Sequence, residues 1–476
     1  PQWFDTLNDD QKKMCSRIYE LWGTYYKKYE TLEDNQKDTY LKFDGNFFVL
    51  GGRFNEMYYW DTYWIVIGLV ACDLEDEAFN LIKSFVNIIE SKGFIPNGTR
   101  KYYLNRSQPP FFPHMLFYLY ENTENQKIRN FILSKGLDAA IEEHRFFMKV
   151  KVTGEETENT FNVYKVYSDK PRFESYKDDL KTYKNSNYNE NIYSNIATAA
   201  ESGWDFSSRW LIDDNLLHTN DIINIVPVDL NAIMLRNEQI IHYFLNIKSN
   251  IKGDLSSTTS VKLYRDAVNY RLTAINNFLW NKNEGVWNDF NTKTKKFTDK
   301  KFYISNLYPL FWMKDVSKNT IYSILYKYKQ ELFGFIGGIP VSGKSENEQC
   351  NQQWDYPNVW APYTQLFIEF LLKSDEKELA LHAARSFYLS VKDKFLNSGY
   401  FFEKYNCENL GKQGDGGEYA VVNGFGWTNG TIVWLIKTFN KELDIEFDHK
   451  ESYEKIVKYL ENKLQTQNEH TETTSN

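Results

Sequence analysis

The feature that most constrains the fold of this chain is a helical repeat of apolar residues that recurs along almost its whole length. In residues 10–29, for example, Met14, Ile18 and Trp22 fall on one face of a helix with 3.6 residues per turn. The same spacing holds in residues 76–91, where Gly93 follows as a stop signal. The pattern predicts helices at residues 10–29, 76–91, 127–150, 228–247, 261–280, 320–333, 359–372, 376–395, 428–439 and 452–464.

Strand-like alternation is rare by comparison. A small hairpin is predicted in residues 286–297, with its turn at residues 291–293. The chain is therefore expected to be mainly α, with long polar connections, of which residues 181–193 are interpreted as a surface loop. Because no Pro- or Ser-rich linker divides it, we expect one domain over residues 1–464, followed by a polar, disordered tail at 465–476.

Composition excludes several classes of protein. The formal net charge is -8 without a basic stripe, which argues against nucleic acid as a partner. No run of 18 apolar residues predicts a membrane span. The aromatic fraction of 17 % fits a large aromatic core, a sugar-binding cleft lined by flat rings, or both. Four scattered cysteines lack the spacing of a zinc site, and their pairing stays open.

Long loops hold the chemistry-bearing residues of this sequence. Each combines glycine, tryptophan, arginine or carboxylates in a way that no helix requires. The stretches are Gly51–Tyr63, Asn97–Pro110, Glu201–Trp210, Gln352–Pro362 and Glu403–Gly430.

Asp205 is the most distinctive carboxyl group in these loops. Gly203 and Trp204 precede it and Phe206 follows, so an aromatic and partly dry setting is expected. Such a setting raises the pKa of a carboxyl group and keeps it protonated, as a general acid requires. Glycoside hydrolysis needs such an acid together with a second carboxylate. The alternative interpretation is a helix N-cap aspartate in front of residues 206–211.

Arg53, Arg106 and Arg172 each lie beside an aromatic residue, a serine or a proline in a loop. The guanidinium group offers a rigid fork of donors that suits sugar hydroxyls and carboxylates. The alternative for each arginine is a solvated position on the surface. The glycine runs lack the spacing of a phosphate-binding loop, and neither a serine-hydrolase nor a zinc motif occurs. No cofactor or metal is therefore expected.

Taken together, six segments resemble the trehalases of glycoside hydrolase family 37, in the order in which that family has them. Residues 51–63 and 353–362 look like the two trehalase signatures. Residues 105–110, 201–210, 414–419 and 424–430 are similar to further family segments. The resemblance spans about residues 40 to 435 and implies an (α/α)6 barrel, in which six outer helices surround six inner ones. It also implies an α,α-trehalase with trehalose as substrate.

The resemblance assigns roles to individual residues by their motifs. It makes Asp205 the general acid and Glu403 the general base of an inverting reaction that releases one α- and one β-glucose. For inversion, the two carboxyl groups should lie about 6.5–9.5 Å apart. The sugar-binding residues that it implies are Arg53, Trp60, Asp61, Asn97, Arg106, Ser107, Gln108, Arg172, Glu174, Gly203 and Glu418.

Some positions depart from the family pattern. Val359 stands where the second signature usually has glycine, and a valine there would be strained if the backbone had a positive φ. Two other readings therefore stay open: a trehalose-binding sensor without turnover, and a related inverting α/α-barrel glycosidase for another disaccharide. The acidic isoelectric point of about 5.6 would suit a secreted or extracytoplasmic enzyme, but the localisation stays unknown.

Overall fold

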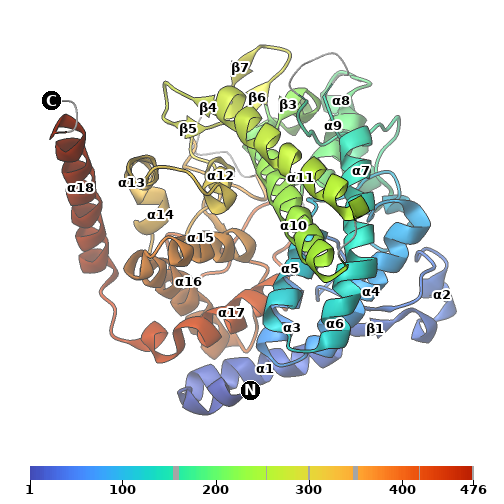
Figure 1. Ribbon diagram of the computed structural model, residues 1–476, viewed down its shortest axis with the longest axis horizontal. Coiled ribbons are helices and arrows are strands. Elements are labelled where there is room, and N and C mark those ends of the chain that lie inside the picture. Colours follow the sequence, from blue (N-terminus) through green and yellow to red (C-terminus); the bar gives the residue numbers. More distant parts are fainter. Residues whose placement is uncertain (154–159, 253–254, 299–300, 347–351, 418, 474–476) are drawn as a thin grey trace.

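Helices form most of the chain in the computed structural model (Figure 1). It describes residues 1–153, 160–252, 255–298, 301–346, 352–417 and 419–473. Local signals explain several helix ends. Asn8 caps α1 (Asp9–Tyr25) in a capping box with Gln11, and α4 (Glu75–Lys92) ends at Gly93, whose φ of 78° is left-handed.

Six helices form a closed inner ring. Each packs against the next in chain order, and the last packs against the first, so the ring has no free edge. They are α3 (Thr62–Ala71), α5 (Phe112–Asn122), α10 (Val228–Lys252), α12 (Tyr308–Trp312), α15 (Ala361–Lys373) and α17 (Gly426–Phe439).

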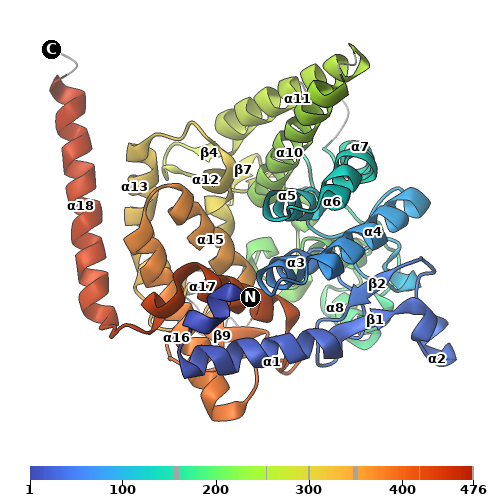
Figure 2. The ribbon, with the colours of Figure 1, turned by 60° about the horizontal axis from the view of Figure 1, so that its bottom comes forward.

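A second layer of helices surrounds this ring. α4 packs on α3 and α5, while α7 (Leu137–Val150) and α11 (Leu255–Ala274) pack on α10. α16 (Lys377–Ser398) covers α15 and α17 and also contacts α14 (Lys329–Phe333), which follows α13 (Lys318–Lys327). The outer layer closes with α1, which runs along α17 (Figure 2). This arrangement confirms the predicted (α/α)6 barrel.

Two glycines allow the first and last inner helices to meet. A Cβ atom on Gly68 of α3 would lie 2.6 Å from the Cα atom of Gly430 of α17. A Cβ atom on Gly430 would overlap the carbonyl oxygen of Trp64. The indole ring of Trp22, on α1, covers this contact. The close approach of α3 and α17 therefore depends on the absence of side chains at both positions.

The predicted helices all occur, but some of their ends differ. The helix expected at residues 10–29 ends at Tyr25, because β1 (Tyr26–Lys28) pairs with β2 (Asn46–Phe48). The helix expected at 320–333 is interrupted at Tyr328. The segment 127–150 is α6 (Gln126–Phe131), one π turn and α7.

The start of the helix predicted at residues 359–372 carries a further correction. Val359 belongs to β8 (Asn358–Trp360), which pairs with β9 (Lys404–Asn406). It is fully buried and is not among the residues with a positive φ. The strain considered for a valine at this position is therefore absent, and the helix α15 begins only at Ala361.

Six helices in the described part of the chain were not predicted, and two of them, α2 (Asp34–Lys37) and α12, have only one turn. All residues of α3 and most of those of α5 are buried, so their sequences lack the polar stripe of an amphipathic helix. α8 (Tyr176–Asn185) and α9 (Ile192–Glu201) flank the segment 181–193, whose expected loop is correct only between the two helices.

The remaining predictions concern the small sheets and the chain end. In the expected hairpin, β6 (Phe290–Asn291) pairs with β7 (Lys296–Phe297) and also with β3 (Ile225–Val226), whereas β5 (Val286–Trp287) pairs with β4 (Trp280–Asn281). α18 (His449–Thr473) projects from the body (Figure 2) and continues into the expected tail at 465–476. Cys15, Cys72 and Cys407 are free and buried, while Cys350 lies outside the described residues.

Candidate active site

A cavity of about 280 Å³ lies at the end of the barrel where the inner helices begin. Asp61 immediately precedes α3, Phe425 precedes α17, and both line the cavity. The loops that were selected from the sequence supply most of the wall. Of the predicted site residues, the wall contains Arg53, Trp60, Asp61, Asn97, Arg106, Gln108, Arg172, Glu174, Gly203, Asp205 and Glu403.

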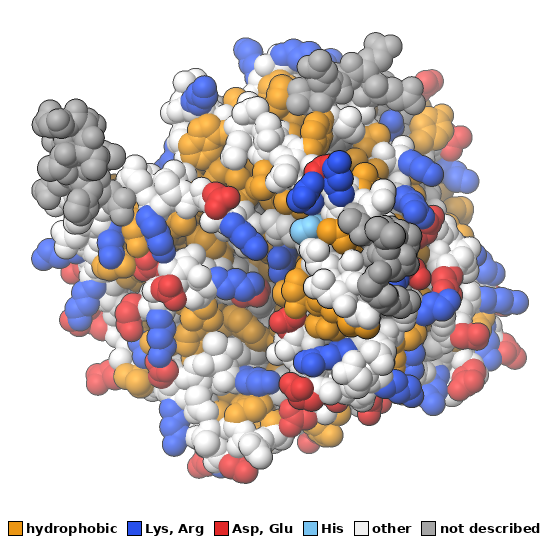
Figure 3. Space-filling model, in the orientation of Figure 1, with side chains coloured by type: hydrophobic (Ala, Val, Ile, Leu, Met, Phe, Trp, Pro, Cys, Tyr) orange, Lys and Arg blue, Asp and Glu red, His pale blue; other side chains and the backbone are white. Residues whose placement is uncertain are grey.

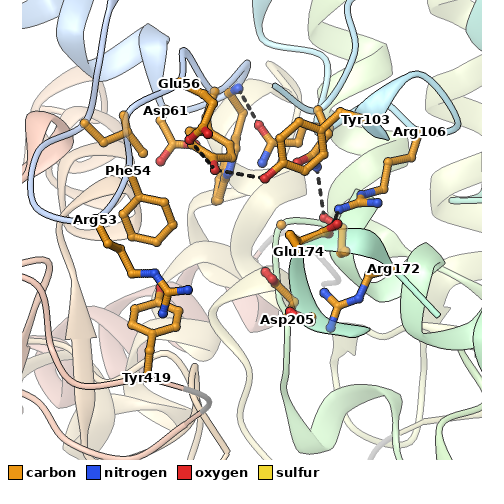
Figure 4. A pocket seen from close by; sticks show the side chains of 18 of the residues that line it. Arg53, Phe54, Glu56, Asp61, Tyr103, Arg106, Arg172, Glu174, Asp205 and Tyr419 are labelled. Carbon is orange, nitrogen blue, oxygen red and sulfur yellow. Dashed lines mark hydrogen bonds and ion pairs between the residues drawn. The ribbon is translucent and has the colours of Figure 1, made fainter. Parts of the chain in front are cut away.

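One side of this cavity holds two arginines and two carboxyl groups (Figure 4). Arg106 forms an ion pair with Glu174, and Arg172 binds Asp179 through Nε and Nη2 at 2.9 and 2.8 Å. Although burial alone would raise the pKa of Glu174, the guanidinium groups of Arg106 and Arg172 hold it below its usual value. Glu174 is therefore an ionised acceptor that faces the cavity next to Asp205.

Packing and hydrogen bonds of the neighbouring residues hold the loop that carries Asp205. Gly203 has a φ of 79°, and a Cβ atom there would lie 2.9 Å from the Trp60 ring. Trp210 donates from Nε1 to the Trp204 carbonyl oxygen at 3.1 Å. Arg209, stacked on the Trp204 ring at 4.7 Å, is buried in two ion pairs. These contacts of Gly203, Trp204 and Arg209 fix the loop on both sides of Asp205.

The alternative interpretation of Asp205 as a helix cap is wrong. The first helical turn after it is a 3-10 turn at residues 208–210. Its cap is Ser207, whose side chain accepts a hydrogen bond from the backbone of Arg209. Asp355 of the second signature accepts two bonds from this turn, from Ser207 Oγ at 2.6 Å and from the backbone of Ser208 at 2.8 Å.

Glu403 immediately precedes β9 and is 2 % exposed. Its Oε1 atom accepts a hydrogen bond of 2.6 Å from the Tyr419 hydroxyl group. Its Oε2 atom is buried and has no hydrogen-bond partner among the described residues. Burial raises the pKa of Glu403 to about 7, while the bond from Tyr419 and the charges of Lys404 and Arg53 act in the opposite direction.

Lys404 joins two of the loops that surround Glu403. Its buried ammonium group donates to the carbonyl oxygens of Gln353, Asp415 and Gly416 at 3.1, 3.2 and 2.9 Å. Burial lowers the pKa of Lys404 to about 8. The lysine therefore connects the second signature to the glycine run, and the same glycine run leads to Tyr419.

The first signature forms the opposite wall. Arg53 lies over the ring of Tyr419, with its guanidinium carbon 5.0 Å from the ring centre, and Figure 4 shows both across the cavity from Arg172. Gln108 accepts a hydrogen bond of 3.0 Å from the backbone of Trp60. Burial and the nearby charges of Glu403 and Asp205 raise the pKa of Asp61 well above its usual value.

Two predicted site residues are not among the described residues that line the cavity. Ser107 is buried but does not line the cavity; its hydroxyl group donates to the Ile95 carbonyl oxygen at 2.7 Å, and its backbone donates to Glu201 at 2.8 Å. These bonds hold the loop in place, and the assignment of Ser107 to the sugar-binding residues stays a prediction. Glu418 lies outside the described residues.

Several wall residues were not selected from the sequence. Tyr419 and Phe54 are examples, as is the group of Glu56, Tyr58 and Tyr103, in which Tyr58 contacts the other two at 3.1 and 2.9 Å. All five lie inside or beside the selected loops. They could have been found by including the aromatic and acidic residues that flank each motif. In the described part of the chain, no cluster of three or more His, Cys, Asp or Glu could hold a metal ion.

Comparison with known proteins relates this site to a family. The family model described as Trehalase matches residues 1–440. Trehalase from Pimpla hypochondriaca is 33 % identical over 465 residues, which are 92 % of this chain and 76 % of that protein. The chain belongs to the trehalase family. Human trehalase is 32 % identical over 459 residues, which cover 93 % of this chain and 76 % of the human protein.

Solved structures support the fold independently. The neutral trehalase of Saccharomyces cerevisiae matches with a TM-score of 0.68 at 22 % identity and covers 86 % of this chain and 75 % of its own. A GH63 mannosylglycerate hydrolase from Thermus thermophilus, in complex with glucose, matches with a TM-score of 0.57 at 14 % identity, over 88 % of this chain and 99 % of its own. Both matches show the fold.

Membership of the trehalase family confirms the enzyme class expected from the sequence, a glycosidase that hydrolyses α,α-trehalose. The family model covers residues 51–63 and 353–362, the two segments that look like trehalase signatures. None of the helices that the structure describes is long and apolar enough to cross a membrane.

Proposed function

We propose that this trehalase cleaves its substrate with inversion, using Asp205 as the general acid and Glu403 as the general base. The Asp205 carboxyl group would give its proton to the oxygen that joins the two glucose units. Glu403 would take a proton from a water molecule as that water attacks the anomeric carbon from the opposite face. One α- and one β-glucose leave, with no covalent intermediate.

The observation that carries this proposal is that two carboxyl groups from separate loops line one cavity of about 280 Å³. Asp205 belongs to the side of Arg172 and Glu174. Glu403 is bonded to Tyr419, which belongs to the side of Arg53. Groups on different sides of a bound sugar are what an inverting reaction requires.

The unpartnered Oε2 atom of Glu403 supports its role as the base. Because Tyr419 already occupies Oε1, only Oε2 is open to a water molecule in the cavity. A pKa of about 7 makes Glu403 a stronger base than an ordinary glutamate, and its ionised form still predominates above neutral pH.

The polar wall supports a disaccharide rich in hydroxyl groups as the ligand. Arg53, Arg106 and Arg172 supply donors in fixed geometry, while Asp61 and Glu174 supply acceptors. A site built to pair hydroxyl groups discriminates strongly against sugars that lack them. Trehalose is therefore preferred over the other disaccharide considered above, and the residues retained in the wall argue against a sensor without turnover.

The stereochemistry can be read directly from the first products. We expect proton NMR of the anomeric signals to show equal amounts of α- and β-glucose in the first minutes, before mutarotation. If α-glucose alone appeared early, the reaction would be retaining, and Asp205 and Glu403 would need other roles.

The two carboxyl groups can be tested by isosteric replacement. Asp205→Asn and Glu403→Gln should each lower kcat by several orders of magnitude, because each removes a proton transfer worth roughly 10²–10⁴-fold or more. Asp178→Asn is the matched control, since Asp178 lines the same cavity without a proposed role. Near-normal turnover of either acid or base variant would rule out that assignment.

A further inference from the structure

A second cavity, of about 260 Å³, lies inside the barrel at the end opposite to the catalytic site. Its wall comes from α3, α5, α10 and α15 and from the end of α12, which contribute Tyr63, Glu121, Arg236, Glu369 and Trp312. It adjoins a hollow of about 460 Å³ that shares Phe117 and Arg236 with it. In the orientation where α10 faces the reader, Figure 3 shows a hollow near the centre of this face with basic side chains around it.

One buried polar group in the wall of this cavity is not satisfied by the described part of the protein. His114 is 5 % exposed, and its Nε2 atom has no hydrogen-bond partner among the described residues. The rings of Phe111 and Trp312 flank the imidazole at 4.6 and 5.0 Å, so its polar edge is held in an apolar setting. A buried polar atom without a partner destabilises the fold, unless a ligand or water supplies the missing bond.

Arg236 is a second polar group in this wall, and it is only partly buried. Its guanidinium group stacks on Phe117 at 4.6 Å and donates to Gln239 at 3.3 Å, but it forms no ion pair within the described part of the chain. Burial lowers its pKa. A partly buried guanidinium group with one weak bond keeps several donors available to a molecule in the cavity.

The lining indicates which chemistry would fit. Arg236 and Lys373 balance Glu121 and Glu369, and Lys373 itself pairs with Glu369 at 2.6 Å, so the wall has no net charge and selects for neither an anion nor a cation. Donors and carboxylate acceptors together suit vicinal hydroxyl groups, while Trp312 and Phe117 offer flat apolar faces. The volume lies near the lower end of the usual range of small-ligand pockets, about 300–1,000 Å³, which leaves room for a small ligand such as a sugar ring.

We propose that this cavity is a second binding site, which takes a small neutral polyhydroxylated molecule of the size of a hexose. The five inner helices that line it begin at the catalytic end, so a ligand here would contact the same helices that carry the active-site loops. The proposal does not rest on the roles given to Asp205 and Glu403, because neither residue contributes to this wall.

The test uses the whole enzyme labelled with 5-fluorotryptophan and glucose as the probe. The ¹⁹F signal of Trp312, assigned with Trp312→Phe, reports this cavity, while the signals of Trp60 and Trp427 report the catalytic cavity. We expect the Trp312 signal to shift with glucose and to saturate below about 50 mM. This concentration is well above a dissociation constant of ~1 mM, which corresponds to a binding free energy of about 4 kcal/mol. Arg236→Met should abolish this shift and leave the shifts of Trp60 and Trp427 in place.

Glu369→Gln is the second variant of this cavity. Glu369 lies at the rim, and this substitution does not bury a new apolar side chain. Arg106→Met is the opposite control: it should weaken the catalytic-site shifts and leave the Trp312 titration unchanged. The proposal would be overturned if the Trp312 signal of the wild type did not change with glucose. It would also be overturned if that signal shifted in Arg236→Met and Glu369→Gln as much as in the wild type. A response to sulfate in place of glucose would show an anion site and would also overturn it. Turnover of trehalose is measured separately, so failure of the proposed mechanism would not be mistaken for failure of this site.

Discussion

At the scale of single residues, the environment of Glu403 explains how a buried carboxylate can serve as a base. Burial raises its pKa to about 7, and the hydrogen bond from Tyr419 and the charge of Lys404 keep that pKa from rising further. Neither partner was selected from the sequence, because a tyrosine or a lysine near a glycine run is common. Their importance follows from long-range contacts: Tyr419 bonds Glu403 from 16 positions away, and Lys404 bonds the Gln353 carbonyl oxygen from 51 positions away.

Removing either partner should therefore change the pH profile. With Tyr419→Phe or Lys404→Met, the pKa of Glu403 rises, so the base becomes protonated at a higher pH. The acidic limb of kcat/KM should move upward by about one pH unit, as expected for the loss of one bond to a charged group. Lys412→Met, at an exposed lysine on the same loop, is the control. A profile that does not move in either variant would mean that Glu403 does not control the acidic limb.

The site residues also show how far motifs alone can lead. The sequence predicted Arg53, Trp60 and Asp61 of the first signature, since arginine and tryptophan in a glycine-rich loop are distinctive, but it missed Phe54 and Tyr58 in the same segment. It could not show that Ser107, within an equally distinctive loop, turns its hydroxyl group to the Ile95 carbonyl oxygen. Which way a loop side chain points depends on its tertiary neighbours, such as Glu201, and not on its own motif.

At the scale of helices, burial decided which elements could be predicted. α1 and α4 each have one polar face, so their 3.6-residue period is visible. α3 is buried on every side, and its sequence is apolar throughout, so no period marks it as a helix. The inner ring was therefore harder to predict than the outer one, and the barrel itself came from the family resemblance.

The contact of α3 with α17 gives a prediction for these two helices. Gly430→Ala would place a methyl group against the Trp64 carbonyl oxygen, and we expect it to lower the free energy of unfolding by about 2 kcal/mol or more. Gly23→Ala on α1 has no atom within 4 Å of the new methyl group and should stabilise the protein by up to about 1 kcal/mol. Urea unfolding of both variants measures the difference, and equal stabilities would show that the two helices can move apart without cost.

The docking of α18 should depend on pH through His382. Its Nε2 atom donates to the Phe333 carbonyl oxygen at 2.8 Å, so in the neutral ring Nδ1 accepts from Ser452 Oγ, also at 2.8 Å. Burial lowers the pKa of His382 from 6.5 to about 4. The stability from this group is complete above pH 6.5 and is lost as the pH falls toward 4, because the unfolded chain then binds a proton that the folded chain excludes.

The loss should approach about 3 kcal/mol in total, at no more than about 1.4 kcal/mol per pH unit. Thermal unfolding between pH 7 and pH 4.5 should show a smaller decrease for His382→Gln than for the wild type. His218→Gln, in a 3-10 turn far from α18, serves as the control. If the wild type and His382→Gln lost stability in parallel, the imidazole would not be the group that titrates.

At the scale of the whole molecule, the closed ring makes the two ends of the chain depend on each other. α17 packs on α3, and α1 packs on α16 and α17. Gln11 donates to the Asn440 carbonyl oxygen at 2.8 Å, which joins residues 429 positions apart. The catalytic cavity likewise needs Arg53 from the first part of the chain and Glu403 from the last.

We therefore expect residues 1–464 to unfold as one unit, in keeping with the single domain predicted from the sequence. Loss of trehalase activity, of far-ultraviolet circular dichroism and of tryptophan fluorescence should follow the same urea curve. Transitions at separate urea concentrations would divide the chain into independent units and contradict the prediction.

The common direction of the inner helices has an electrostatic consequence. Each helix begins at the catalytic end, so each directs the positive end of its dipole, equivalent to roughly half a charge, toward that side of the barrel. The same cavity contains Glu56, Asp61, Glu174, Asp205 and Glu403, whose mutual repulsion would otherwise oppose folding. A ring of parallel helices thus provides a field in which acidic side chains can be concentrated.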